Sequence, residues 1–278
     1  MTSTPLPMTP GRRIALLLGV PLALVIIAWT GLTEVAFAGV GSYPVRLAVP
    51  VHGNTVSLSL GPADTQVTEA AGSKLRLTGT AHYSLVRSTV TWHTTASGVS
   101  VSPRCHFLTG VCSFSFRAVL PAGKRAYLSD GSGNLTLRGL TGPVVAGSGS
   151  GDMRASLLSG AVSLQTGSGN ITGGTLSGPR VTLSAGSGNI VITSLTSLHL
   201  AAYDGSGNIS LVFSAVPDHV EVTASSGNVS LVLPPGPARY QVDATTDSGN
   251  RTVHLPGTSA PTHVIKVTAG SGNISITN

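Results

Sequence analysis

Short runs in which apolar and polar residues alternate recur through the second half of the chain. Each run keeps a fixed distance from a four-residue phrase, most often Gly-Ser-Gly-Asn, whose last residue serves as the reference. Around Asn134, apolar residues stand one and three positions after the reference (Leu135, Leu137) and six and eight before it (Leu128, Ala126). Because side chains of a strand alternate between two faces, each unit is predicted to hold two short strands joined at the phrase.

The references repeat every 18 to 23 residues and are the predicted structural corners: Asn134, Asp152, Asn170, Asn189, Asn208, Asn228, Asn250 and Asn273. The units differ in length only in the segment between the second apolar pair of one unit and the first apolar pair of the next. This is expected of a solenoid, in which the strands and one corner must stack while another corner can take extra residues. The sequence therefore predicts an all-β fold, a single-stacked β-solenoid of about 18–23 residues per coil with an aliphatic core. An all-β sandwich, the alternative, does not explain the nearly constant corners.

The corner residues and two departures from the pattern refine this prediction. Gly and Asn tolerate positive φ, which is one reason for their presence at tight corners. Arg251 occupies a position predicted to point inward, and Gly173 replaces a side chain at another, so the penultimate coil is expected to be distorted. The chain stops two residues after Ile276, which makes that end, without a separate cap, a candidate edge for end-to-end self-association.

The part of the chain between the N-terminal segment and the repeats lacks the corner phrase. Residues 51–121 contain strand-like runs and are predicted to form an irregular β cap or early coils, ahead of a repeat domain over 122–278. A cap of this kind would cover strand edges that the end of a solenoid otherwise exposes. Residues 34–50 are predicted to be a linker with an extended end.

The N-terminal segment indicates export. Residues 14–32 carry no charge, a length that spans the hydrocarbon core of a bilayer as a helix. A single-pass transmembrane helix is predicted over 12–33, with the tail 1–11 in the cytoplasm and the rest outside the cell membrane, because Arg12 and Arg13 precede it. A cleaved signal peptide ending at Ala36-Phe37-Ala38 is the alternative, and a twin-arginine signal is a weaker one.

Cys105 and Cys112, the two cysteines, lie close together in a chain predicted to be exported, so a disulfide is expected. Zinc binding is disfavoured, since there is no second cysteine pair and only His106 lies nearby.

Composition excludes several classes of protein. Charged residues are 9% and aromatic residues 4% of the chain, while 41% hydrophobic residues argue against disorder. The net charge of +6 is spread along the sequence, with no basic run longer than Arg12-Arg13. Nucleic-acid binding, which favours a concentrated basic face with aromatic residues, is therefore not predicted.

Three stretches resemble a known family: the tandem SGN/SGD corners, LPAGKRAYLSDGSGN at 120–134 and LPPGPARYQVDATTDSGN at 233–250. They are similar to a bacterial family of proposed adhesins of unknown function, over residues from about 50 to 278. The resemblance implies a repetitive β-solenoid, often behind one N-terminal membrane helix, and a role at the cell surface. The cysteine pair is similar to that of actinobacterial members. The family offers no catalytic residues to carry over.

Stacking coils in chain order would create one surface patch with chemical potential. Glu221 and Asp243 would lie within about 5 Å, with His219 and His199 beside them. Such a group could bind a cation or perform acid–base work. A solvated patch whose repulsion is relieved by Lys266 is the favoured interpretation, because no further carboxylates converge. Ten acidic residues spread over the chain are too few for a polysaccharide lyase or hydrolase. A calcium-binding roll needs repeated Asp ligands, and only Asp152 among the eight corners is an aspartate, so no catalytic residue, metal or cofactor is predicted.

These observations favour a non-catalytic, membrane-anchored module that contacts an envelope protein or a glycan outside the cell. A regulatory partner that senses envelope stress is an alternative that sequence does not separate from adhesion. A cation-binding or carbohydrate-active protein using the Glu221, Asp243 and His219 patch is the less favoured one.

Overall fold

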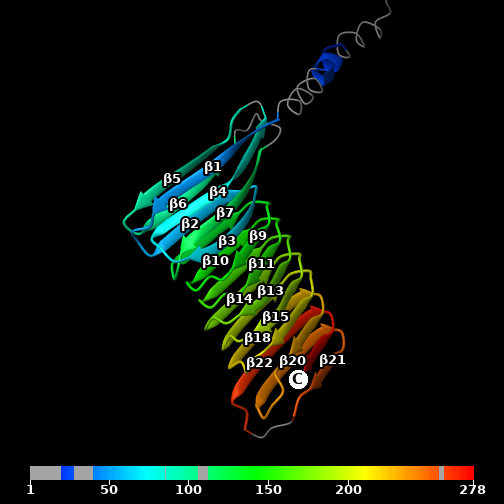
Figure 1. Ribbon diagram of the computed structural model, residues 1–278. Coiled ribbons are helices and arrows are strands. Elements are labelled where there is room, and N and C mark those ends of the chain that lie inside the picture. The colour runs from blue at the N-terminus through cyan, green and yellow to red at the C-terminus, as the bar shows by residue number, and fades with distance from the viewer. Residues whose placement is uncertain (1–19, 28–39, 85, 106–111, 257–259) are drawn as a thin grey trace, which may run out of the picture.

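The computed structural model describes residues 20–27, 40–84, 86–105, 112–256 and 260–278. Its strands form two long sheets, one of 12 strands (sheet A) and one of 11 strands (sheet B), which face each other along an elongated stack (Figure 1). Most neighbouring strands in both sheets are parallel. The predicted all-β solenoid is confirmed.

Each regular coil gives one strand to each sheet. Sheet B takes β8 (Arg125–Asp130), β10 (Val144–Ser148), β12 (Val162–Thr166), β14 (Arg180–Ala185), β16 (His199–Asp204) and β18 (His219–Ser226). Sheet A takes β9 (Leu135–Arg138), β11 (Met153–Ser156), β13 (Ile171–Leu176), β15 (Ile190–Leu195), β17 (Ile209–Phe213) and β19 (Val229–Val232). The predicted SGN or SGD corner joins the two strands of each of these coils.

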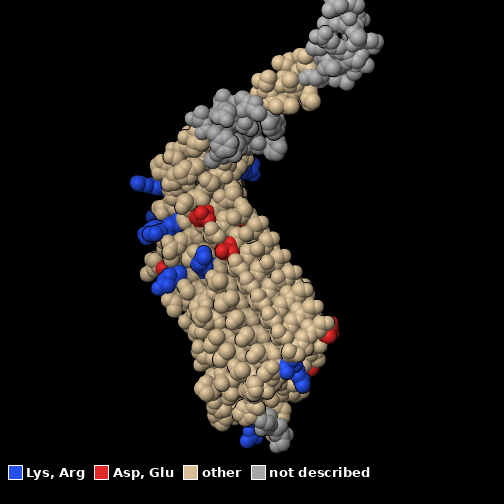
Figure 2. Space-filling view, turned by 90° about the vertical axis from the view of Figure 1, so that its right-hand side faces the viewer, with Lys and Arg blue, Asp and Glu red and all other residues tan. Residues whose placement is uncertain are grey.

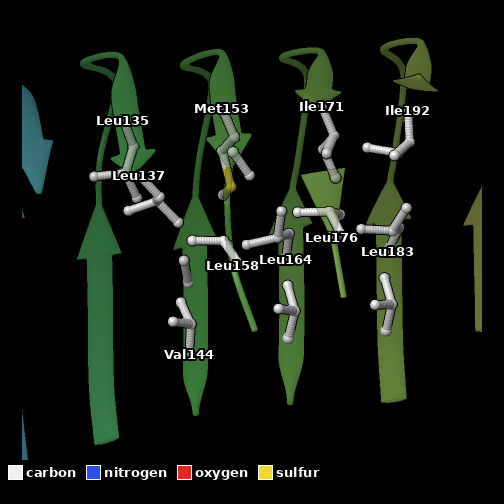
Figure 3. Close-up of a cluster of buried hydrophobic side chains, with 14 of the residues drawn as sticks. Leu135, Leu137, Val144, Met153, Leu158, Leu164, Ile171, Leu176, Leu183 and Ile192 are labelled. Carbon is white, nitrogen blue, oxygen red and sulfur yellow. The ribbon is translucent and has the colours of Figure 1, made fainter. Parts of the chain in front are cut away.

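Stacking brings equivalent apolar residues into continuous columns. Leu135 pairs with Met153, Met153 with Ile171 and Ile171 with Ile190, and all four side chains are fully buried. The same repetition from coil to coil is visible in Figure 3. Burying aliphatic side chains contributes roughly 1.5–3 kcal/mol each, so the columns hold the stack together.

Gly173 departs from these columns for a reason that the packing shows. A Cβ at Gly173 would lie 2.7 Å from Cδ1 of Ile192 in the next coil. The Ile192 side chain therefore occupies the space that a side chain at position 173 would need. The core has no gap at Gly173, because the side chain of Ile192 fills the volume.

The N-terminal end combines parallel coils with an antiparallel cap. Its strands are β1 (Val40–Pro50), β2 (Thr55–Gly61), β3 (Ala63–Ala70), β4 (Lys74–Ser84), β5 (Thr89–Thr95), β6 (Gly98–Arg104) and β7 (Cys112–Pro121). The coil β2/β3 stacks on β8/β9, and β6/β7 stacks on β2/β3. Strands β5, β4 and β1 then pair antiparallel to cover this end. The predicted linker over 34–50 is, from Val40 on, a strand of sheet A, because its alternate residues Val45 and Val49 are buried.

The C-terminal end does not follow chain order, and the predicted order is wrong. Strands β22 (His263–Ser271) and β23 (Ile274–Thr277) lie between β18/β19 and the earlier coil formed by β20 (Tyr240–Ser248) and β21 (Arg251–His254). Burial explains the insertion: Ile265 and Ile276 are fully buried and need neighbours on both sides, whereas Arg251 is exposed. The coil with the arginine suits the end of the stack.

As a result, the open edge at this end belongs to β20 and β21, and the edge predicted after Ile276 is an internal position. The guanidinium Nη1 of Arg251 donates to the carbonyl of Ala244 (3.2 Å), across the end of the coil. End-to-end self-association stays a prediction, now for a different pair of strands.

The N-terminal segment is described only over residues 20–27, which are helical. Within the part of the chain that the structure describes, no helix has the length and apolar character needed to cross a bilayer. The remainder of the predicted spanning segment over 12–33 and the Ala36-Phe37-Ala38 cleavage pattern lie outside the described residues.

Candidate functional site

The predicted corners form a hydrogen-bonded ladder along one edge of the stack. At each step, the backbone N–H of a reference residue donates to the side-chain Oδ1 of its neighbour, at 2.8–3.2 Å. The order along the stack is Asp64, Asn134, Asp152, Asn170, Asn189, Asn208, Asn228, Asn273 and Asn250. At several rungs the side-chain Nδ2 donates to the same oxygen, for example from Asn208 to Asn189 at 3.2 Å. The corner residues therefore satisfy backbone donors where the chain turns.

The ladder begins at Asp64, which lies outside the SGN repeats. Its segment, Gly61-Pro62-Ala63-Asp64, lacks the phrase and gave no corner signal. The spacing of apolar residues could have identified this corner. As around the predicted corners, Val56 and Leu58 stand eight and six positions before Asp64, and Val67 stands three after it. The one aspartate among the eight predicted corners, Asp152, accepts the backbone N–H of Asn170 (2.9 Å), and this bond lowers its pKa.

Glycine is required at these corners by close approach of the backbones. A Cβ at Gly188 would overlap the carbonyl oxygen of Gly169 in the adjacent coil, and the same holds for Gly169 above Gly151. Among the described residues, Gly227 is the one member of the SGN phrases whose φ is positive. The explanation by positive φ therefore fails for the other corner residues: stacking at strand distance, rather than chain reversal, selects glycine.

A second column, four positions before each reference, lies buried inside the corner. It holds Asp130, Ser148, Thr166 and Asp204 together with alanines. The Oγ of Ser148 accepts the N–H of Gly151 (2.9 Å), and Oδ1 of Asp204 accepts the N–H of Ser206 (3.0 Å). Burial raises the pKa of Asp204, and raises that of Asp130 to about 6. The repeat pattern did not single out this column.

The predicted surface patch is rearranged by the insertion of β22. Glu221 and Asp243 are both in register with Lys266, which lies between them. The Nζ of Lys266 is 3.4 Å from Oε1 of Glu221, and both side chains are about half exposed. The predicted Glu221–Asp243 adjacency is therefore wrong, because it assumed that coils stack in chain order.

The histidines of the patch lie side by side but gain no third ligand. His199 is in register with His219, whose other neighbour is Val264. The described residues contain no group of three His, Cys, Asp or Glu side chains arranged to hold a metal ion. An exposed pair such as Lys266–Glu221 contributes about 0–1 kcal/mol, so the patch is a solvated ion pair beside two histidines.

Serine and threonine are frequent among the outward side chains of the regular coils, beside exposed residues such as Tyr127, Val145 and Tyr203. In sheet A, Ser210 and Ser230 pair in one column, and the hydroxyls of Ser194 and Ser214 lie 2.9 Å apart at the next corner. The hydroxyl of Thr193 donates to the carbonyl of Gly173 (3.2 Å) in the neighbouring coil. The coils thus present a flat, regular surface rather than a deep cleft.

The disulfide lies at the other end of the stack. Cys105 and Cys112 are bonded, with their Cα atoms 5.9 Å apart. Cys112 begins β7 and Cys105 follows β6, so the bond closes the corner of the outermost parallel coil.

A parallel β-solenoid with stacked SGN corners is the class that these features define. The family described as Toastrack DUF4097 matches residues 120–277, more than half of the chain, and the chain belongs to this family. The resemblance predicted from the corner phrases is confirmed. No curated protein matches the chain.

Solved structures that are similar to it include three bacterial proteins. A proposed lipid-binding protein from Parabacteroides distasonis ATCC 8503 has 14% identity and a TM-score of 0.51, covering 86% of this chain and 96% of its own. A proposed cell adhesion protein from Clostridium sporogenes ATCC 15579 has 11% identity and a TM-score of 0.26, covering 86% and 99%. A proposed adhesin from Bacteroides fragilis NCTC 9343 has 10% identity and a TM-score of 0.39, covering 84% and 97%. The first of these supports the fold, and neither the family description nor these names refers to an enzyme.

Proposed function

We propose that this chain is a non-catalytic interaction module, held at the outer side of the cell membrane by a single N-terminal helix. The observation that carries the proposal is the in-register outer surface of the stack. Columns such as Ser210–Ser230 repeat the same polar group at about 4.8 Å, a spacing that suits many weak contacts with an extended partner.

The sequence before the stack supports the membrane attachment. The uncharged run 14–32 follows Arg12-Arg13, and the described helix over 20–27 falls inside it. A disulfide between Cys105 and Cys112 suits an oxidising compartment outside the cytoplasm.

Membrane topology tests this proposal with two single-cysteine additions to the full chain. Ser168→Cys lies at an exposed corner, and Thr9→Cys lies in the predicted cytoplasmic tail. A membrane-impermeant maleimide is expected to label Ser168→Cys in intact cells, and Thr9→Cys only after permeabilisation. Labelling in the opposite order contradicts the proposal. Loss of an N-terminal tag with release of the chain supports the cleaved signal peptide instead.

Partner identity requires a second experiment. Cross-linking of the full chain in intact cells, followed by purification, is expected to recover an envelope protein or glycan bound to the stack. Recovery of a sensor kinase would support the regulatory alternative and contradict a purely adhesive role.

A further inference from the structure

Five exposed arginines lie on the outer face of sheet A near its N-terminal end. They are Arg46 on β1, Arg76 on β4, Arg117 on β7, Arg138 on β9 and Arg154 on β11. In the order of sheet A, five of six consecutive strands, β1-β4-β7-β3-β9-β11, thus carry an outward arginine. We name these five residues the arginine face.

Strand register places the arginine face in two adjacent rows. Arg46, Arg117 and Arg154 share one row, connected through residues that pair directly: Thr78, Gln66 and Thr136. Arg76 and Arg138 share the next row, connected through Val119 and Thr68. The guanidinium groups therefore alternate between rows along the stack, over about 24 Å at about 4.8 Å per strand.

Neither of the two side-chain ion pairs in the described part of the chain involves an arginine of this face. These pairs, Asp218–His263 and Glu221–Lys266, lie near the other end. Lys74, on the same outward side of β4 as Arg76, adds a further cation. Figure 2 shows Lys and Arg side chains gathered over the N-terminal part of the stack, with a few acidic side chains among them.

Three carboxylates lie near the arginine face: Asp64 and Glu69 on β3, and Asp152, which interacts electrostatically with Arg154. Oδ1 of Asp64 accepts both N–H and Nδ2 of Asn134, at 2.8 and 3.1 Å. Oε2 of Glu69 accepts the N–H of Thr141 at 2.9 Å. None of the three forms a side-chain ion pair with the arginine face. The five guanidinium groups and Lys74 outnumber these three carboxylates, so the face keeps a net positive charge that favours an anion.

A hollow of about 510 Å³ lies on the same face. Its polar lining includes Asp64, Gln66, Thr78, Arg117, Asn134 and Thr136. Hydroxyl, amide and carboxylate groups thus stand beside the guanidinium group of Arg117, a combination that can hydrogen-bond sugar hydroxyls and an anionic group together.

We propose that the arginine face binds an acidic polysaccharide of the cell envelope, a proposal that rests on the extracytoplasmic role proposed above. The polymer lies along the stack, with carboxylate or phosphate groups on the guanidiniums and sugar hydroxyls in the hollow. Arginine suits this task, because its planar fork binds such anions through two parallel hydrogen bonds. The outward residues of the six strands include no Phe, Tyr or Trp, whereas single-stranded nucleic acid is held by stacking on aromatic side chains.

Charge reversal of the full chain, purified in neutral detergent, tests the proposal. Arg117→Glu with Arg154→Glu is expected to lower affinity for polygalacturonate at least tenfold, measured by calorimetry, with a shallower dependence on salt. The matched control is Arg125→Glu with Arg180→Glu, two exposed arginines on sheet B, which is expected to change affinity less than twofold. Neutral dextran is expected not to bind.

Three results would overturn the proposal: unchanged affinity in the sheet A variant, an equal loss in both variants, or single-stranded DNA binding as tightly as polygalacturonate. Circular dichroism of each variant confirms that the fold is intact, because all four positions are exposed. Binding to the purified chain does not depend on its location. Cytoplasmic labelling in the topology experiment, with polygalacturonate binding retained, would therefore reject the proposed function while leaving the arginine face as an anion site.

Discussion

Single side chains at the corners determine how closely one coil can lie on the next. Asn189 accepts two hydrogen bonds from Asn208 and donates two to Oδ1 of Asn170. Each corner asparagine thus accepts the backbone N–H of the coil on one side, while its own N–H is accepted by the asparagine on the other side. Asp152 shows that a carboxylate also serves as an acceptor in this position.

Replacing a rung is expected to cost stability because it leaves corner donors without a partner. Asn189→Ala should lower the free energy of unfolding by about 1–3 kcal/mol. Asn189→Asp, which keeps the acceptor, should lose less. Ser187→Ala, at an exposed position of the same corner, is the control and should be close to neutral. Chemical denaturation checks the series, and equal losses at positions 187 and 189 would contradict the ladder's role.

The buried carboxyl of Asp130 makes stability depend on pH. Its pKa is raised from 3.8 to about 6, mainly by burial, so the folded chain binds this proton more tightly than the unfolded chain does. The stabilisation is fully present below about pH 4 and is lost as the pH rises to about 6, with a slope of at most about 1.4 kcal/mol per pH unit.

Asp130→Asn removes this titration. Relative to the wild type, the variant is expected to gain stability as the pH rises from 4 to 7, measured by urea unfolding at each pH. Asp243→Asn changes an exposed carboxylate on the same sheet and serves as the control. Parallel pH profiles for the wild type and Asp130→Asn would show that position 130 does not set this dependence.

At the level of strands, the position of a coil in the stack decides what its residues contribute. Strand β23 is flanked by β19 and β21, whereas β21 is the last strand of sheet A. The inward residue Ile276 is fully buried, and the Arg251 side chain is exposed at the end.

Two truncations distinguish this order from stacking in chain order. Ile276→Ala is expected to cost about 2–5 kcal/mol, as large-to-small changes in a packed core do. Arg251→Ala is expected to cost under about 1 kcal/mol, because it loses one part-buried hydrogen bond of an exposed side chain. Hydrogen exchange of the unmodified chain gives an independent reading, with β23 protected and β21 exchanging fast. The reverse pattern would place β23 at the end.

The sequence predicted the register of the coils but not their order. Inward columns such as Leu135–Met153–Ile171 followed from a period of two and a fixed corner, which are local properties. The insertion of β22 and β23 depends on which coil tolerates an open end, a comparison between distant segments. Arg251 departed from the apolar pattern and so marked its coil as unusual. That this coil forms the end of the stack became clear only from the burial of its residues compared with those of the β22/β23 coil.

The two candidate surfaces, the Glu221–Asp243 patch and the arginine face, also depend on the order of strands in the sheet, which the sequence did not predict. The Glu221–Asp243 patch was expected from chain order and is separated by Lys266 in the sheet. The arginine face escaped detection because its members come from strands far apart in the chain, so that no basic run marks them.

The stack as a whole is one-dimensional, because each coil contacts mainly the coils on either side. The 12 strands of sheet A extend over about 50 Å at about 4.8 Å per strand. The antiparallel strands β1, β4 and β5 cover one end, whereas the edges of β20 and β21 are open at the other, with Asp243 and Arg251 exposed on that coil. In such an architecture, stability is approximately a sum of coil and interface contributions.

The disulfide provides a test of this additivity. Replacing Cys105 and Cys112 by serine removes a short closed loop worth roughly 2.5 kcal/mol by loop entropy. Because coupling passes through neighbours, the loss should be concentrated in β6 and β7 and should leave the strands from β16 to β19 unchanged. Hydrogen exchange followed by mass spectrometry measures protection strand by strand. A uniform loss along the stack would mean that the coils unfold as one cooperative unit. The arginine face, which includes Arg117 of this disulfide-closed coil, would then depend on the integrity of the far end as well.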